Sequence, residues 1–366
     1  MPNRPTLLAY LNGMPDVEST FPVLARLHKR GKVKVQAQVY SKLLRKEPRL
    51  ARAFHDEGFM PEPMSKWRMK LFYKKDINAA DAVLTIADPN WDSTTRKQRG
   101  AHIRKTGQQS IFLQHGAYQL GINGSLKGLR MNYYSQKILL WEELGENIKF
   151  IEEESAERGQ VVGFTKKNTL PRKTWGPEVN DWVARHPKRL LVCQSFRWGM
   201  GRYSDNSIAH FYNLMDALLS KHPDVGIVIR SHRGKVRKNH RNHDKILADT
   251  HPNVMFSHYY SGPLAKASIH DAIDLCDAMI SPTSTTVLDC IYSGKPAAVF
   301  AEGLDIFGEL QQISDQATIE AFIGSLDKTD PVYQKIRTRF GSLDENLDRA
   351  AKAIEDYLFA IRTVKN

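Results

Sequence analysis

Polar and charged side chains follow four apolar runs of the sequence, at the points where predicted strands end. They are Gln114-His115-Gly116, Gln194-Ser195-Phe196-Arg197, Arg230-Ser231-His232 and Ser281-Pro282-Thr283-Ser284-Thr285-Thr286. Open α/β sheets bind ligands beyond the carboxyl ends of their strands, because side chains from several strands converge there. The four clusters therefore predict ligand-binding residues at the carboxyl edges of parallel sheets.

The cluster around Ser284 predicts a phosphate site. Ser284 is expected to cap a helix that begins at Thr285 and stops at Gly294, a residue type that suits a helix end. Backbone N–H groups at such a helix start, with the hydroxyls of Thr285 and Thr286, favour a bound anion. A plain helix cap is the alternative, but a cap alone does not need so many neighbouring hydroxyl groups.

Arg230 and His232 are candidates for a further contact with the same phosphate. Arginine offers a permanently charged bidentate donor, and a histidine two residues away can share the phosphate. A turn in a solvated basic loop is the alternative, because a basic run continues from Arg233 to Arg241.

His115 is the candidate general base. An imidazole near its ordinary pKa can accept a proton from a hydroxyl group at neutral pH. Gly116 has no side chain to block a substrate, and Gln114 and Tyr118 are placed where they could orient the ring. A buried structural histidine is the alternative, and the spacing leaves it open.

Two β/α series position these clusters. Apolar runs predict strands at Thr6–Leu11, Val33–Tyr40, Ala82–Ala87, Ser110–Gln114, Lys137–Trp141, Gln160–Phe164 and then at Arg189–Gln194, Val225–Arg230, Asn253–Ser257, Asp277–Ser281 and Ala297–Ala301. The alternation in Val33–Tyr40 favours a half-exposed edge strand. A polar, proline-marked stretch, Thr165–Pro187, is the predicted linker, and Leu343–Arg362 is a predicted amphipathic helix. The pattern predicts two doubly wound α/β domains that face each other, residues 1–165 and 166–366.

Composition narrows the class of protein. The chain has 366 residues and a formal net charge of +13, which favours anionic partners. No apolar run reaches the ~18 residues of a membrane-spanning helix, and the N-terminus is a poor secretory signal. The three cysteines, Cys193, Cys276 and Cys290, form no CxxC pair and are predicted to be buried thiols. The expected compartment is the cytoplasm.

The motifs resemble those of GT-B-fold transferases, most closely the CDP-glycerol glycerophosphotransferase (teichoic-acid and capsule polymerase) superfamily. Ile280–Asp289 with Gly294-Lys295-Pro296 is similar to the donor motif of that superfamily, and Arg230-Ser231-His232 is similar to its Arg-Pro-His segment. Phe112–Gly116 is similar to its His-Gly motif, and Leu190–Arg197 resembles the strand that ends in Pro-Thr-x-Arg.

The resemblance implies a GT-B-like fold, with two Rossmann-like domains around a central cleft and a C-terminal helix that returns toward the first domain. It implies a transferase that moves a glycosyl or polyol-phosphate group from a nucleotide-activated donor (CDP/CMP- or UDP-linked) to a surface polysaccharide or lipid-linked acceptor. His115 would be the base, and Gln114, Gly116 and Tyr118 would lie on the acceptor side. The donor nucleotide would be bound by Arg230, His232, Ser284, Thr285, Thr286, Asp289, Ser195 and Arg197, without a metal or another cofactor.

Two other functions remain as alternatives. A nucleotide-sugar 2-epimerase shares the two-domain layout but needs carboxylates for proton abstraction, and none stands beside His115 in the sequence. A nucleic-acid-binding protein would explain the charge of +13, but the basic run Arg230–Arg241 lacks interleaved stacking aromatics.

The segment Lys66–Lys75, KWRMKLFYKK, interleaves aromatic and basic residues. This composition suits contact with an anionic membrane surface, which would put the protein at the inner face of the plasma membrane. A helix packed on its own domain is the alternative.

Overall fold

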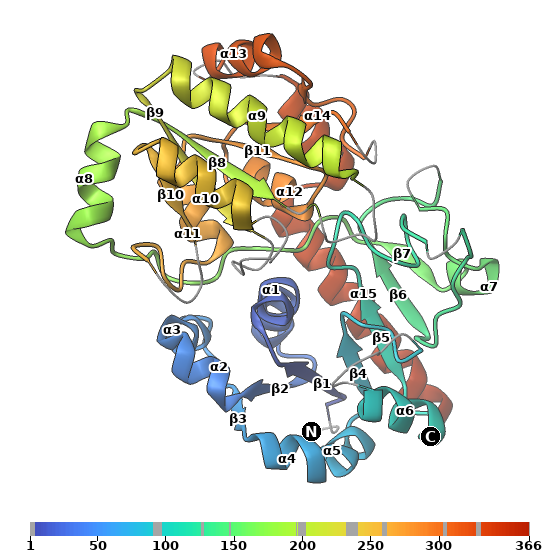
Figure 1. Ribbon diagram of the computed structural model, residues 1–366. Helices are drawn as coiled ribbons and strands as arrows, with labels where there is room; N and C mark the ends of the chain where they lie inside the picture. The colour runs from blue at the N-terminus through green and yellow to red at the C-terminus, as the bar shows by residue number, and fades with distance from the viewer. Residues whose placement is uncertain are drawn as a thin grey trace. The chain divides into compact units, whose positions relative to one another are not determined.

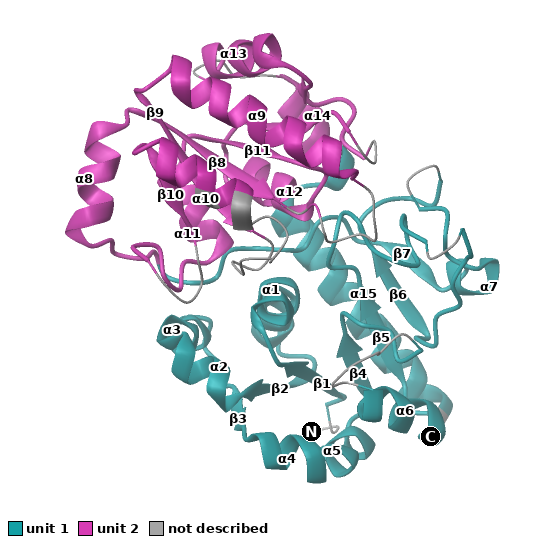
Figure 2. Ribbon diagram, in the orientation of Figure 1, with its two compact units in different colours: residues 1–171, 338–366 teal, residues 172–337 magenta. Residues whose placement is uncertain are grey.

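The structure is a computed structural model that describes residues 4–90, 97–125, 128–145, 148–194, 196, 203–231, 241–257, 262–302, 306–326 and 331–365. The chain forms two compact units (Figure 2). Unit 1 comprises residues 1–171 and 338–366, and unit 2 comprises residues 172–337. Unit 2 is therefore an insertion into unit 1.

Unit 1 is built on a seven-stranded sheet with the order β3-β2-β1-β4-β5-β6-β7 (Figure 1). Every pairing in it is parallel. The chain winds outward from β1 in one direction and from β4 in the other, so the topological switch point lies between β1 and β4. The strands are β1 (Thr6–Leu11), β2 (Lys34–Tyr40), β3 (Glu62–Met64), β4 (Ala82–Thr85), β5 (Ser110–Leu113), β6 (Lys137–Leu140) and β7 (Gly159–Val161).

Helices cover both faces of this sheet. Leu7 and Leu11 of β1 belong to a core formed with α1 and α15, whereas Leu8 belongs to a core formed with α5 and α6. Alternate residues of a strand point to opposite faces, so β1 is buried on both sides. The helices are α1 (Met14–Arg30), α2 (Ser41–Lys46), α3 (Pro48–Asp56), α4 (Lys66–Leu71), α5 (Tyr73–Ala79), α6 (Lys97–Thr106), α7 (Glu153–Ala156) and α15 (Leu343–Lys365).

The terminal helix α15 is part of the core of unit 1. Its residues Leu347, Ala350, Ile354 and Leu358 are buried in the same hydrophobic cluster as α1, at the spacing that the sequence predicts for one helix face. Because the helix completes this core, the prediction that it returns to the first domain is confirmed.

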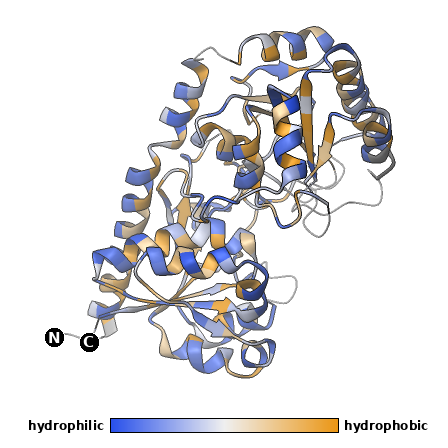
Figure 3. Cartoon of the chain, turned by 90° about the vertical axis from the view of Figure 1, so that its left-hand side faces the viewer, coloured by the Kyte–Doolittle hydropathy of each residue, from blue (hydrophilic) through white to orange (hydrophobic). Residues whose placement is uncertain are grey.

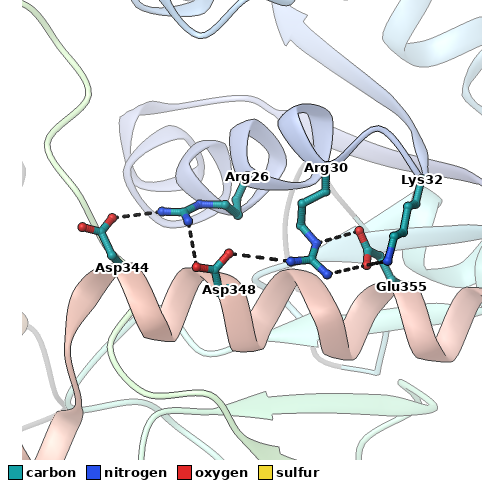
Figure 4. Close-up of polar contacts among 6 residues, drawn as sticks. All are labelled: Arg26, Arg30, Lys32, Asp344, Asp348 and Glu355. Atoms are coloured by element: carbon teal, nitrogen blue, oxygen red, sulfur yellow. Dashed lines mark hydrogen bonds and ion pairs between the residues drawn. The ribbon is translucent and has the colours of Figure 1, made fainter.

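Ion pairs between α1 and α15 accompany the apolar contact between these two helices (Figure 4). Arg26 of α1 contacts Asp344 at 2.9 Å and Asp348 at 2.8 Å. Arg30 binds both carboxylate oxygens of Glu355, at 2.8 and 2.9 Å, and the Glu355 side chain is only 3% exposed. Bidentate pairing and the burial of Glu355 favour a strong interaction between Arg30 and Glu355.

Unit 2 repeats the same plan on a six-stranded sheet with the order β10-β9-β8-β11-β12-β13. Its pairings are also parallel, and its switch point lies between β8 and β11. The strands are β8 (Lys188–Gln194), β9 (Val225–Ser231), β10 (Val254–Phe256), β11 (Ala278–Ser281), β12 (Ala297–Phe300) and β13 (Gln312–Ile313).

The helices of unit 2 are α8 (Pro177–Arg185), α9 (Asp205–Lys221), α10 (Arg241–Thr250), α11 (Ile269–Leu275), α12 (Thr285–Tyr292) and α13 (Gln316–Gly324), and α14 (Pro331–Phe340) leads the chain back into unit 1. In Figure 3 many helices carry hydrophobic and hydrophilic colours along the same ribbon, as expected of helices with one buried side. None of the described helices is long and apolar enough to cross a membrane.

The doubly wound α/β fold class is confirmed, but two details differ from the sequence predictions. The division between the units lies at 171/172 instead of 165/166, and residues 338–366 belong with unit 1. The prediction that Val33–Tyr40 forms an edge strand is wrong, because β3 pairs with β2 and covers it. β3 has only three residues and contains Pro63, so it leaves no alternating pattern in the sequence.

Candidate functional site

The predicted phosphate-binding residues of unit 2 that the structure describes lie at the carboxyl edge of its sheet, around the switch point. Arg230 is near the end of β9 and is the register partner of Cys193, near the end of β8. Ser284 follows β11, the neighbour of β8 on its other side, and opens α12. Arg230 and Ser284, 54 residues apart in the sequence, thus follow or end the two strands that flank β8.

Several of the predicted site residues act on the thiol of Cys193. Burial raises the pKa of the Cys193 thiol to about 12, while the charge of Arg230 and a hydrogen bond with Thr286 oppose the rise, and Asp289 adds to it. The charges of Arg230 and Asp289 thus act on the same buried thiol that Thr286 contacts. A buried cation stands beside the start of a helix, which is a suitable place for a phosphate group.

The start of α12 has the predicted cap. The Ser284 hydroxyl accepts the N–H of Thr286 at 3.4 Å and also the Thr286 hydroxyl at 3.2 Å. Ser284, Thr285 and Thr286 are half-buried, so their polar groups remain partly accessible. Asp289, one turn further into the helix, is 1% exposed. The hydroxyl residues are thus the accessible part of this cluster, and Asp289 is its interior part.

Arg230 is fixed in place by its neighbours. It is 8% exposed, and its guanidinium donates a hydrogen bond to the Ser257 hydroxyl, which directly follows β10. A preoriented guanidinium loses little further freedom when it binds an anion. Ser195, Arg197 and His232, which the sequence also assigns to this site, lie outside the described residues.

A buried acid supports the same edge and was missed by the sequence analysis. Asp244 of α10 accepts a hydrogen bond from the Gln194 amide at 2.9 Å and another from the Tyr212 hydroxyl at 2.7 Å. Burial raises the pKa of Asp244 to about 6, against the effect of these two bonds. The Asp244 carboxyl group therefore holds Gln194 at the end of β8. This contact could not be predicted from the sequence, because no local pattern links residues fifty positions apart.

In unit 1, His115 follows β5 at the carboxyl edge, as predicted, and is half-buried. Its backbone N–H donates to the side-chain oxygen of Gln119 at 3.2 Å. The Gln114 amide donates to the carbonyl of Gly116 at 3.0 Å and accepts the N–H of Trp141 at 2.8 Å. Gln114 therefore positions the backbone around His115, whereas the sequence analysis placed it to orient the ring.

The loop after His115 is held by its own side chains. The Asn123 amide donates to the carbonyl of Ala117 and accepts the N–H of Gln119. Tyr118 packs its ring against Gly124, where an added Cβ would come within 2.6 Å of the ring. A residue without a side chain is therefore needed at position 124 for this placement of Tyr118. Gly116, which directly follows His115, is buried.

The switch point of unit 1 contains a small cavity that the sequence analysis also missed. It is lined by residues from β1, β4, α1 and α6, among them Tyr10, Asn12, Asp16, Thr20, Thr85 and Arg99. The Arg99 guanidinium lies 4.3 Å from the centre of the Tyr10 ring, a cation–π contact. No local sequence pattern links these residues, because β1 and β4 become neighbours only in the folded sheet.

Asp88 lies just after β4, but its carboxylate serves the backbone. One oxygen accepts the N–H groups of Asn90 and Tyr134, and the other accepts the N–H and hydroxyl of Ser135, all within 2.9 Å. Four donors fill the acceptor positions of a carboxylate. Asp88 therefore has a structural position, in which it joins the segment after β4 to Tyr134 and Ser135.

Comparisons of the sequence give no assignment: no family model matches the chain, and no curated protein matches it.

Comparison of the structure gives clear similarities. The chain is similar to a putative UDP-N-acetylglucosamine 2-epimerase from Listeria monocytogenes (TM-score 0.65, 12% identity, 97% of each chain covered). It is similar to the UDP-GlcNAc 2-epimerase from Neisseria meningitidis bound to UDP-GlcNAc (TM-score 0.60, 14% identity, 97% of this chain and 100% of that chain). It is also similar to the wall teichoic acid polymerase TagF in a crystal soaked with CDPG (TM-score 0.52, 12% identity, 98% and 89%). At these identities the likeness concerns architecture, and the chain has the GT-B-like fold that these proteins share.

Proposed function

We propose that this protein is a transferase that moves a glycosyl or polyol-phosphate group from a CDP-, CMP- or UDP-linked donor to a hydroxyl group of a surface polysaccharide or its lipid-linked precursor. The observation that carries the proposal is the gathering of Arg230 and the Ser284–Thr286 helix start around the switch point of unit 2. A fixed guanidinium beside a helix N-terminus suits the phosphates of a nucleotide.

In the proposed reaction unit 2 holds the leaving nucleotide. Arg230 and the N–H groups at the start of α12 neutralise the charge that develops on its phosphate, so the reaction does not require a metal. Ser284, Thr285 and Thr286 contribute hydroxyl donors, and Asp289 helps to position α12. Ser195, Arg197 and His232 complete the donor site in this proposal.

Unit 1 supplies the base. His115 takes the proton of the acceptor hydroxyl as the new bond forms, and the residue lies half-buried directly after β5. Gln114 fixes the backbone that carries His115. Gly116 and Tyr118 shape the acceptor side.

A nucleotide-sugar 2-epimerase is the second candidate. It is supported by the TM-scores of two 2-epimerase structures, 0.65 and 0.60, which are higher than the 0.52 of the polymerase. Asp88, the carboxylate that follows β4, does not add support, because its oxygens already accept four hydrogen bonds. An epimerase must remove and return a proton at a carbon atom, which needs a base that faces the ligand.

One experiment separates the candidates. The protein is incubated with UDP-GlcNAc alone in D₂O and followed by NMR, and its affinities for CDP, CMP, UDP and a single-stranded oligonucleotide are measured by calorimetry. Nucleotide binding without change of the sugar supports the transferase. Formation of the 2-epimer with deuterium at carbon 2 would establish the epimerase. Preference for the oligonucleotide would make both proposals wrong.

The proposed place of action is the cytoplasm at the inner face of the plasma membrane, where nucleotide-activated donors and lipid-linked acceptors meet.

A further inference from the structure

The helix α4 is a surface that unit 1 leaves uncovered. None of its residues is buried, and Trp67 and Leu71 are 72% and 66% exposed. Phe72, directly after the helix, is 54% exposed. Residues four apart lie on the same side of a helix, so Trp67 and Leu71 form one apolar strip. The alternative that this segment packs on its own domain therefore fails for α4.

Basic side chains surround the exposed apolar strip. Lys66, Arg68, Lys70, Lys74 and Lys75 are all exposed, and residues 66–75 contain no acidic side chain. Arg68 reaches Glu62 at 3.9 Å, and the ammonium group of Lys70 lies 5.9 Å from the Trp67 ring. Exposed aromatic groups are thus combined with a dense positive charge.

The next helix, α5, holds this segment on the body of unit 1. Tyr73 and Ile77 are 7% and 0% exposed and belong to a core cluster with Leu8 and Ile103. The Tyr10 hydroxyl donates to the carbonyl of Tyr73 at 3.4 Å. α4 is therefore displayed from a firm base, so its ordering does not have to occur upon binding.

We propose that residues 66–75, the docking segment, bind an anionic lipid bilayer. Tryptophan, phenylalanine and leucine side chains enter the boundary between headgroups and acyl chains, and lysines beside them meet anionic headgroups. A nucleic acid or an acidic protein could bind the basic side chains of the docking segment, but neither explains why Leu71 and Phe72 are exposed beside those side chains.

The docking segment also sets an orientation. α4 begins directly after the carboxyl end of β3, and His115 follows the carboxyl end of β5 in the same parallel sheet. The two strands are four positions apart in the strand order, or about 19 Å at ~4.8 Å per strand. Docking therefore brings the carboxyl edge toward the bilayer, within reach of a lipid-linked acceptor. This last step rests on the proposed function, whereas docking itself does not.

The first test is sedimentation with vesicles of phosphatidylcholine and phosphatidylglycerol. The wild type should bind at 50 mM salt, more weakly at 500 mM, and not to pure phosphatidylcholine. The triple variant Lys66→Gln, Lys70→Gln, Lys74→Gln should lose about 100-fold in affinity, at about fivefold per charge. Its matched control removes the same charge elsewhere on unit 1, through Lys105→Gln, Lys149→Gln and Lys167→Gln, and should lose less than tenfold.

The apolar part has its own variant. Trp67→Ala with Leu71→Ala should abolish the binding that persists at 500 mM salt. The control variant Leu129→Ala with Val364→Ala, at two residues that are 66% and 88% exposed, should not. Because all four side chains are exposed, both variants should fold like the wild type. Equal losses in the two lysine triples, or no binding by the wild type at 50 mM salt, would overturn the proposal, as would stronger binding to an oligonucleotide than to vesicles.

The second test concerns orientation. A fluorophore is attached to Lys42→Cys, just after β2, or to Lys34→Cys, at the start of β2, since the native cysteines are buried. Headgroup nitroxide lipids should quench the label at position 42 more than that at position 34. The opposite order, or equal quenching of both labels, would make the orientation wrong. Nucleotide affinity measured on the triple variant should equal that of the wild type, so a failure of docking is distinct from a failure of the proposed function.

Discussion

Replacing Arg230 with glutamine tests the phosphate site most directly. Arg230 is 8% exposed and is held by Ser257, so the side chain is already placed for a ligand. A lost hydrogen bond to a charged group costs about 1.5–3 kcal/mol. The dissociation constant for a nucleoside diphosphate should therefore rise about 10- to 150-fold. Part of the substitution's effect will fall on stability, because Asp289 lies buried in the same cluster.

The assay is calorimetric titration with CDP and UDP, accompanied by urea unfolding of each variant. Arg189→Gln is the matched control, because Arg189 pairs with Asp277 at 2.8 Å at the opposite end of β8. This variant should lose stability without loss of nucleotide affinity. Ser257→Ala, which keeps the charge but removes the contact that holds it, should weaken binding only severalfold. A folded Arg230→Gln protein that binds nucleotides within twofold of the wild type would refute the assignment of the phosphate site.

Three other predictions follow from the described contacts. His115→Ala should reduce turnover about 10²- to 10⁴-fold in a transfer assay while nucleotide affinity stays unchanged, and full activity would make His115 structural. Glu355→Gln should lower the free energy of unfolding by about 2–3 kcal/mol in urea titrations, since it breaks the buried bidentate pair with Arg30. The control Lys352→Gln removes an exposed ion pair with Asp356 and should lower the free energy of unfolding by less than about 0.5 kcal/mol. The pKa of Asp244 is about 6 in the folded protein against an ordinary 3.8. Between pH 3.8 and about 6 the folded state thus binds a proton at Asp244 that the unfolded state has lost. The free energy of unfolding therefore falls as the pH rises through this range, by up to about 3 kcal/mol. Asp244→Asn should remove this slope from unfolding curves recorded at pH 4 to 7, and an unchanged slope would contradict the assignment.

Local patterns predict the elements of this fold well where residues interact with near neighbours in the chain. The Ser284 cap, the start of α12 at Thr285 and the stop near Gly294 follow from residue types within ten positions, and all are found. The buried face of α15 likewise follows from its own periodicity. The position of His115 after β5 follows from the apolar run before it.

Long-range partners could not be predicted from the same patterns. Gln194 meets Asp244 across fifty positions, and Arg30 meets Glu355 across 325. Neither pair leaves a periodic signal, because only the topology of the sheets or the return of α15 brings its members together. The cavity beside Tyr10 and Arg99 was missed for the same reason, since it forms where β1 and β4 become neighbours.

The insertion of unit 2 into unit 1 has a consequence for biosynthesis. During translation the whole of residues 172–337 leaves the ribosome before α15, so unit 2 can fold while unit 1 still waits for its last helix. Until Leu347, Ile354 and Leu358 arrive, the apolar side of α1 that they cover stays open to solvent, to chaperones and to proteases. A chain that stops short of Leu343 keeps that side open permanently. The terminal helix thereby makes the survival of unit 1 depend on complete synthesis of the polypeptide.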